Sequence, residues 1–200
     1  MKRKNIFLLI MLLIPAFSFA QLKLDLNINT GISFFHLNKA YAVSEYDSKL
    51  LLKGGLELNY EFNSNIGLGV GVNYSDTKDA QVLNFDQRFQ AISIPVNIHT
   101  NFNSIKFGTY IGLALNYKIN EDYDYASMSF AKYEYRNYTT STFAGIYYIL
   151  SSKIKLGIHF ETDIQPFFSY QYMSTDVPVD KIYLRSVSVK LGYTLFGNNL

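Results

Sequence analysis

Apolar and polar residues alternate along most of the chain with a period of two. From Ile66 to Tyr74, aliphatic and aromatic side chains occupy one phase, while glycines and an asparagine occupy the other. Only an extended strand places two such sets on opposite faces, because successive side chains of a strand point in opposite directions. Strands of about ten residues with this alternation are typical of proteins that cross an outer membrane as a β-barrel.

The same alternation predicts eight strands. We expect them at about 22–35, 50–62, 66–74, 92–102, 105–117, 137–150, 154–165 and 183–196. Three short turns alternate with four longer, mostly polar loops. This arrangement places both termini of the mature chain on the side of the short turns, which is the periplasmic side of such barrels. In the 137–150 stretch both phases are partly apolar, so its facing stays open. Pro95 cannot donate a ladder hydrogen bond, and we expect a β-bulge there.

Alternation alone does not decide which phase points into the barrel, because a soluble lipocalin-like barrel would use the same strands with the apolar phase inside. The glycines favour the membrane arrangement, since an eight-stranded interior is barely wide enough for side chains. Those on the polar phase are Gly67, Gly69, Gly71, Gly108, Gly112, Gly157 and Gly192. The large aliphatic phase would overfill such a lumen but suits lipid. The sequence therefore predicts an all-β fold, an eight-stranded antiparallel up-and-down transmembrane β-barrel.

The first twenty residues form a different kind of segment. Lys2, Arg3 and Lys4 precede an apolar run that ends at Pro15, and small residues follow as far as Ala20. This is the pattern of a secretory signal peptide, and the run is too short to span a bilayer well as a helix. We predict a signal peptide at residues 1–20 and an outer-membrane barrel domain at residues 21–200.

Charge and cysteine content exclude several classes of function. Without the three basic residues of the predicted signal peptide, the 18 Lys and Arg residues fall to 15, against 16 Asp and Glu. No basic patch suited to nucleic acid is then expected. The chain has no cysteine, which excludes disulfides and thiolate sites. We predict no cofactor and no nucleic-acid partner.

Several short motifs resemble the PorT-like outer-membrane β-barrel family. They are Leu56–Phe62, Gly67–Ser75, Ile92–Asn97 with its Ile-Pro step, Phe107–Gly112 and Leu191–Phe196. The chain is more distantly similar to the transmembrane domain of OmpA and to OmpX. The resemblance implies an integral protein of the bacterial outer membrane, and it supplies no catalytic motif.

Titratable side chains on the inward phase could form a metal or acid–base site, since His159, Glu161 and Asp163 share one face of a strand. Buried charges need partners whatever the function, however, so we favour a structural polar network. Its predicted members are Lys23, Asp25, Lys53, Glu57, Glu61, His99, Lys106, Lys155, His159, Glu161, Asp163 and Lys190. For Lys190 we expect His159 or Glu161 as the partner, with Asp25 also within reach.

We predict no catalytic, cofactor-binding or metal-binding residue. His36 near Ser33 and His99 near Ser93 are weak serine–histidine candidates, because such proximity is common by chance. The resulting hypothesis is a barrel with a side-chain-filled lumen and a structural or surface-interaction role. Its partners would be outer-membrane lipid and a protein or small molecule at the long loops. The alternatives are a membrane-embedded lipid-modifying enzyme and a narrow pore or secretion accessory protein.

Overall fold

The computed structural model describes residues 21–38, 49–82, 85–122, 131–166, 168–172 and 180–197. The elements within these ranges are β1 (Gln21–Asn38), β2 (Lys49–Glu61), β3 (Ile66–Val82), β4 (Phe85–Phe102), η1 (Asn103–Ile105), β5 (Phe107–Asp122), β6 (Ala131–Tyr135), β7 (Tyr138–Ile149), β8 (Ile154–Asp163), β9 (Phe168–Tyr172) and β10 (Asp180–Phe196). No helix in these ranges is long and apolar enough to cross a membrane. The predicted signal peptide lies outside the described residues and stays a prediction.

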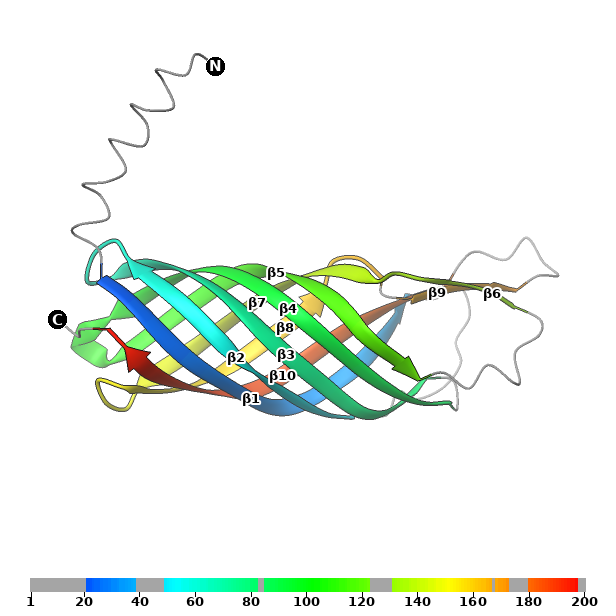
Figure 1. The fold of residues 1–200 in the computed structure, drawn as a ribbon, viewed down its shortest axis with the longest axis horizontal. Helices are drawn as coiled ribbons and strands as arrows, with labels where there is room; N and C mark the ends of the chain where they lie inside the picture. The colour runs from blue at the N-terminus through cyan, green and yellow to red at the C-terminus, as the bar shows by residue number, and fades with distance from the viewer. Residues whose placement is uncertain are drawn as a thin grey trace, which may run out of the picture.

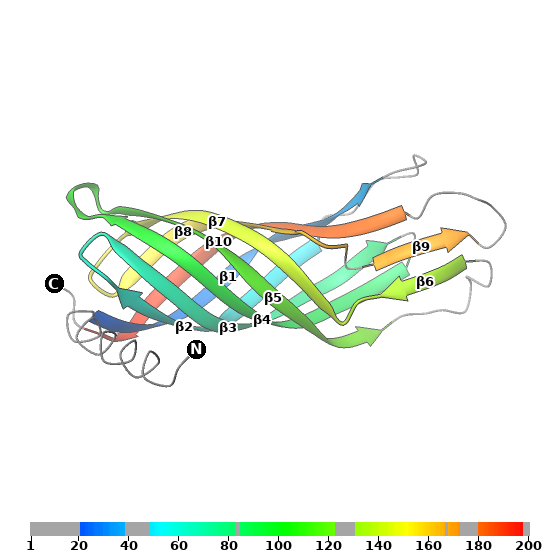
Figure 2. The ribbon, with the colours of Figure 1, turned by 90° about the horizontal axis from the view of Figure 1, so that it is seen from above.

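Eight of the strands close into an antiparallel barrel, as predicted. The order around the wall is β1-β2-β3-β4-β5-β7-β8-β10, and β10 pairs with β1 from Leu24↔Phe196 to Asn38↔Lys181 to complete the ring. Figure 1 shows the strands strongly tilted against the long axis of the molecule, and Figure 2 shows the wall from a second side. Because the sheet closes on itself, the barrel strands have no free edges within the membrane.

Two short strands, β6 and β9, extend the wall at one end of the barrel (Figure 2). They pair with each other, and β9 also pairs with β10 above the end of β8. The sequence predicts loops for both segments, and this prediction is wrong. Residues 75–82 and 85–91, which the sequence places in a polar loop, are also strand, since β3 and β4 continue past the apolar phase. Strands can continue beyond the membrane because backbone hydrogen bonds hold them together. Alternation of apolar and polar side chains is required only where one face of a strand contacts lipid.

The short connections lie together at the opposite end, next to the described chain ends (Figure 1). Between β4 and β5 the chain makes the turn η1, and Lys106 follows with a φ of 56°. Its carbonyl accepts a hydrogen bond of 2.7 Å from the Ile149 amide, and its side chain is exposed. The prediction that Lys106 points into the lumen is therefore wrong, because this residue makes the reversal between two strands and does not belong to either one.

The apolar phase faces outward on every barrel strand. Ile28 is 50% exposed on β1, Val72 56% on β3 and Ile111 64% on β5. A continuous surface of this kind is unfavourable in water, but it matches the lipid-facing band of a membrane barrel. The open question about β7 is also answered: Ile146 and Tyr148 point outward, while Phe143 and Tyr147 are buried.

Pro95 is accommodated without the expected bulge. The β3–β4 register is the same on both sides of it, from Val70↔Val96 to Asn73↔Ser93. Register shifts occur elsewhere on β4, next to Ala91 in its pairing with β5 and opposite Thr77 in its pairing with β3. A Cβ at Gly71 would lie 3.3 Å from the Pro95 ring, so a glycine on the neighbouring strand leaves room for the ring and the strand stays in register.

Aromatic rings inside the barrel lie over glycines on neighbouring strands. The Tyr147 ring covers Gly108, the Phe143 ring approaches Gly112, and the Tyr110 ring covers Gly145. A side chain at any of these glycines would occupy the space that the ring fills. Three large rings therefore fit into a narrow lumen because small residues face them.

We expect Gly108→Leu to lower the free energy of unfolding by about 1–3 kcal/mol, because the new side chain collides with the Tyr147 ring. In a Tyr147→Ala background, the same substitution should be neutral or stabilising, since the leucine then fills the void that the ring leaves. Urea unfolding of the barrel in lipid vesicles measures all four members of the cycle. Equal effects of Gly108→Leu in the two backgrounds would contradict the proposed packing.

Candidate functional site

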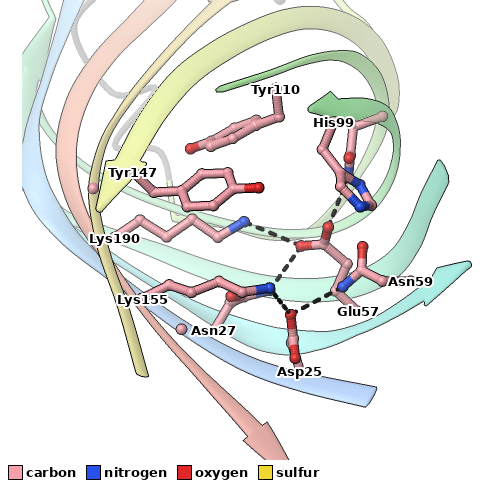
Figure 3. Close-up of a pocket in the computed structure, with 12 residues that line it drawn as sticks. Asp25, Asn27, Glu57, Asn59, His99, Tyr110, Tyr147, Lys155 and Lys190 are labelled. Carbon is pink, nitrogen blue, oxygen red and sulfur yellow. Dashed lines mark hydrogen bonds and ion pairs between the residues drawn. The ribbon is translucent and has the colours of Figure 1, made fainter. Parts of the chain in front are cut away.

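The candidate site is the polar interior of the barrel, which side chains from facing strands fill. Figure 3 shows the half nearer the short turns, where lysines from one side of the wall reach carboxylates on the other. Over the whole interior, eight of the twelve predicted network residues form four lysine–carboxylate pairs: Lys23–Glu61, Lys53–Glu161, Lys155–Asp25 and Lys190–Glu57. Lys23 and Glu61 lie on the neighbouring strands β1 and β2, whereas the other three pairs join strands that are not neighbours in the sheet.

Asp25 is one centre of this network. Its carboxylate accepts hydrogen bonds from Lys155 Nζ at 2.9 Å, from Asn59 Nδ2 at 3.0 Å and from the Thr194 hydroxyl at 2.7 Å. Asp25 is 4% exposed. Both carboxylate oxygens are thus hydrogen-bonded, as a buried charge requires.

Glu57 is the second centre, and it corrects the expected partner of Lys190. Lys190 on β10 pairs with Glu57 on β2, and not with His159 or Glu161 as expected: its Nζ atom lies 3.1 Å from Glu57 Oε2. The strand β1 lies between β10 and β2. Asn27 and Asn97 also donate to the Glu57 carboxylate, at 2.7 and 2.8 Å (Figure 3 shows this group). Strands in a sheet lie about 4.8 Å apart, so a lysine can reach over one intervening strand on the concave side of the wall.

Glu61 and His99 meet across a glycine of the strand between them. The Glu61 Oε1 atom lies 3.2 Å from His99 Nε2 and 3.5 Å from Lys23 Nζ. Gly67 on β3 pairs with both residues, and a Cβ there would lie 2.9 Å from Glu61 Oε2. The absence of a side chain at Gly67 therefore lets β2 and β4 interact directly over β3.

Glu161 forms a separate group nearer the long-loop end. Its carboxylate accepts from Lys53 Nζ at 2.7 Å and from the Ser141 hydroxyl at 2.6 Å, and it lies 3.3 Å from His159 Nε2. Lys53 on β2 and Glu161 on β8 are separated by β1 and β10, so this pair crosses the lumen. Asp163 stands apart from these pairs: its carboxylate accepts from the Leu184 amide at 3.1 Å.

Two aromatic residues, Tyr110 and Tyr147, line the same part of the interior as Asp25 and Glu57, and sequence reasoning missed their role. The Tyr110 hydroxyl lies 2.9 Å from His159 Nδ1, and the Tyr147 hydroxyl donates to Asn101. Lys190 Nζ lies 4.8 Å from the centre of the Tyr110 ring, within the range of a cation–π contact. The inward phase of β5 could have indicated Tyr110, which alternates with lipid-facing residues there, but both phases of β7 are partly apolar, so alternation could not have indicated Tyr147.

Little space remains in the interior. One cavity, lined by Asp25, Glu57 and Tyr110 among others, has a volume of about 40 Å³, and a second, lined by Lys53, Phe89 and Glu161 among others, has about 30 Å³. A single water needs about 10–15 Å³ measured in this way. Each cavity thus holds a few waters at most.

The polar contacts do not form the relay that nucleophilic catalysis requires. In a catalytic triad, histidine lies between the nucleophile and the carboxylate. Here Glu161 lies between Ser141 and His159, and Ser141 is 0% exposed. Ser93 and His99 are six residues apart on β4, about 20 Å at strand spacing, and the side chain of His36 lies outside the described part of the structure.

Metal-ligating side chains do not gather at any point in the described ranges. No group of three or more His, Asp or Glu side chains there could hold a metal ion. His159 and Glu161 are close to each other, but Asp163 bonds instead to the backbone of β10. Of the three side chains that the sequence places on one face, Asp163 is therefore engaged apart from His159 and Glu161.

Comparison with known proteins identifies the family. The sequence profile of the outer membrane protein beta-barrel domain matches residues 6–194. The chain belongs to this family. Together with the lipid-facing band, membership makes the chain an integral protein of the bacterial outer membrane. No curated protein sequence matches.

Several solved structures have a similar fold. OprG from Pseudomonas aeruginosa is 14% identical, with 86% of this chain and 95% of that chain covered and a TM-score of 0.45. Ail, the attachment invasion locus protein of Yersinia pestis, is 11% identical, with 87% and 99% covered and a TM-score of 0.42. The outer membrane enzyme PagL is 10% identical, with 84% and 98% covered and a TM-score of 0.47.

Proposed function

We propose that this outer-membrane barrel is a structural or surface-interaction protein that neither conducts ions nor catalyses a reaction. The observation that carries the proposal is the set of three lysine–carboxylate pairs that join non-neighbouring strands across the interior, Lys53–Glu161, Lys155–Asp25 and Lys190–Glu57, with cavities of only about 40 and 30 Å³ beside them. Eight strands enclose just enough room for side chains, and here those side chains are bonded to one another.

A conducting path would require several of these contacts to break together. An ion that passed Lys53 and Glu161 would have to separate a pair 2.7 Å apart that crosses the barrel. It would also have to pass the Tyr110 ring and the pair of Lys190 with Glu57. Separating buried charges is costly, so the closed state is strongly favoured.

The same contacts argue against a catalytic lumen. Ser141 donates a hydrogen bond to Glu161, and the same carboxylate also accepts a hydrogen bond from Lys53. A general base must reach the proton of the nucleophile directly or through one water. The polar groups of this interior are arranged to satisfy one another, which is the arrangement expected of a structural network.

Within the family we place the chain in the PorT-like group, on the motifs of β2 to β5 and β10 that resemble it. In this group the barrel would contact outer-membrane lipid with its apolar face and a protein or small molecule with its long loops. The continuation of the wall through β6 and β9 supports a surface role, since it raises strand structure above the membrane at the loop end.

Planar-bilayer recordings test this proposal. We expect the purified protein to show no steady single-channel steps in 1 M salt, a concentration chosen to screen weak surface fields, while a Glu161→Ala/Lys53→Ala variant should show more frequent transient current. Phospholipid and lipid A should both remain intact on incubation with the wild type. Stable steps in the wild type would identify a pore, and hydrolysis that His159→Ala abolishes would identify an enzyme.

A further inference from the structure

The outer wall carries a groove on the lipid-facing side of β4, β5, β7 and β8. Its volume is about 490 Å³, and its floor is at Ala144. Ala144 pairs with Ile111 on one side and Phe160 on the other. Both neighbours are large and exposed, at 64% and 43%. A small residue between two large ones on the apolar phase therefore leaves a hollow at β7, within a groove whose lining residues come from all four strands.

Aromatic pairs show how deep in the membrane this groove lies. Phe107 and Tyr148 form an edge contact at 5.2 Å near the short-turn end, and Tyr117 and Tyr138 pack at 5.2 Å near the long-loop end. Aromatic side chains of membrane barrels collect at the two interfaces of the bilayer. The ten-residue spacing along each strand, with strands tilted, matches a band about 25 Å tall. The groove at Ala144 thus runs from the periplasmic interface toward the middle of the bilayer.

The interfacial end of the groove carries two hydroxyl groups. Thr100 Oγ1 and Thr109 Oγ1 lie 2.8 Å apart, two residues from Phe102 and Phe107 along their own strands. Both threonines line the groove. The pair holds two hydroxyl hydrogens and uses one in the bond between them, so the other can be donated to an acceptor outside the pair.

We propose that the groove binds one acyl chain of a phospholipid from the periplasmic leaflet, with the ester carbonyl of that chain at Thr100 and Thr109. The location decides the occupant: the apolar wall faces the hydrocarbon of an outer membrane, and the polar pair lies where the ester groups of the inner leaflet begin. The groove is mainly apolar and has one polar end, which matches the polarity of an ester-linked lipid chain. Filling it removes apolar surface from loose contact with fluid lipid.

Native mass spectrometry of the whole protein tests the proposal, with palmitoyl-oleoyl phosphatidylethanolamine added in mild detergent as the probe. We expect one tightly retained phospholipid on the wild type. Ala144→Phe should lower its retention about tenfold, because the ring takes the place of several chain methylenes. The matched control is Val70→Phe, which adds a ring at similar depth on β3, outside the groove; it should leave retention unchanged.

Thr109→Val provides a second test that keeps the shape of the groove. It removes one hydroxyl, so the retained phospholipid should exchange several-fold faster with the bulk, and the electrophoretic mobility of the unheated protein reports whether each variant folds. Equal retention in the wild type, Ala144→Phe and Val70→Phe would overturn the site. A dimer mass that Ala144→Phe abolishes would also overturn it, because the occupant would then be a second copy of the chain.

Discussion

Val70→Arg is expected to lower the free energy of unfolding in lipid by about 2–4 kcal/mol, because an arginine on the lipid face at the bilayer midplane destabilises the folded barrel by that amount. Val70 is 42% exposed on β3, midway between Ile66 at the periplasmic turn and Tyr74 near the other interface. The guanidinium would have to remain in hydrocarbon or reach an interface along the wall. Urea unfolding in phospholipid vesicles, followed by tyrosine fluorescence, measures the change.

The matched control is Ile66→Arg, on the same face of the same strand. Ile66 is 43% exposed but lies at the interface, where the cost falls to about 0–1 kcal/mol. A difference between the two variants therefore reports depth in the membrane rather than exposure. If both substitutions cost the same, β3 does not cross the bilayer as described.

Glu161→Gln is expected to lower the free energy of unfolding by about 3–5 kcal/mol, because it leaves Lys53 buried without a carboxylate. The Lys53 side chain is 6% exposed and its ammonium lies 2.7 Å from the carboxylate. The substitution keeps the size and the hydrogen-bonding oxygen of the side chain, so the loss measures the charge. Equilibrium unfolding in lipid vesicles gives the value.

Two further variants separate this effect from a general loss of packing. Glu161→Gln/Lys53→Met should recover most of the lost stability, since no unpaired charge remains in the lumen. Lys153→Gln, in an exposed turn, should change stability by less than about 0.5 kcal/mol. A Glu161→Gln variant as stable as the wild type would show that the Lys53 charge finds another partner.

The sequence alone predicted the facing of most strands, because a period of two is a local property. Leu68 and Val70 alternate with Gly67 and Gly69, and a membrane requires the apolar set to point outward. The same rule indicated that Asp25 and Glu57 point inward. On β7 the rule was silent, because Phe143 and Tyr147 are apolar residues inside the barrel. Their place depends on the glycines of the neighbouring strands, which alternation within one strand does not show.

Local pattern also could not show where strands end or bend. Lys106 continues the alternation of β5, yet it makes the turn before that strand. Pro95 suggested a bulge, but Gly71 on the next strand removed the need for one. The segments of β6 and β9 alternate over only five residues each, too short a run to predict a strand that crosses the membrane. They form strands because β9 pairs with β10 of the wall and β6 pairs with β9.

The sequence by itself determined the class of the fold, the number of membrane-crossing strands and the polar character of the lumen, because each follows from which residues alternate along a strand. Only the tertiary structure decided which charged side chains pair with each other. Lys190 reaches Glu57 and Lys53 reaches Glu161, over separations of 133 and 108 residues. These partners depend on strand tilt, register and closure, which set the height of each side chain in the barrel. The groove at Ala144 likewise exists only because closure and register place Ile111 and Phe160 beside it.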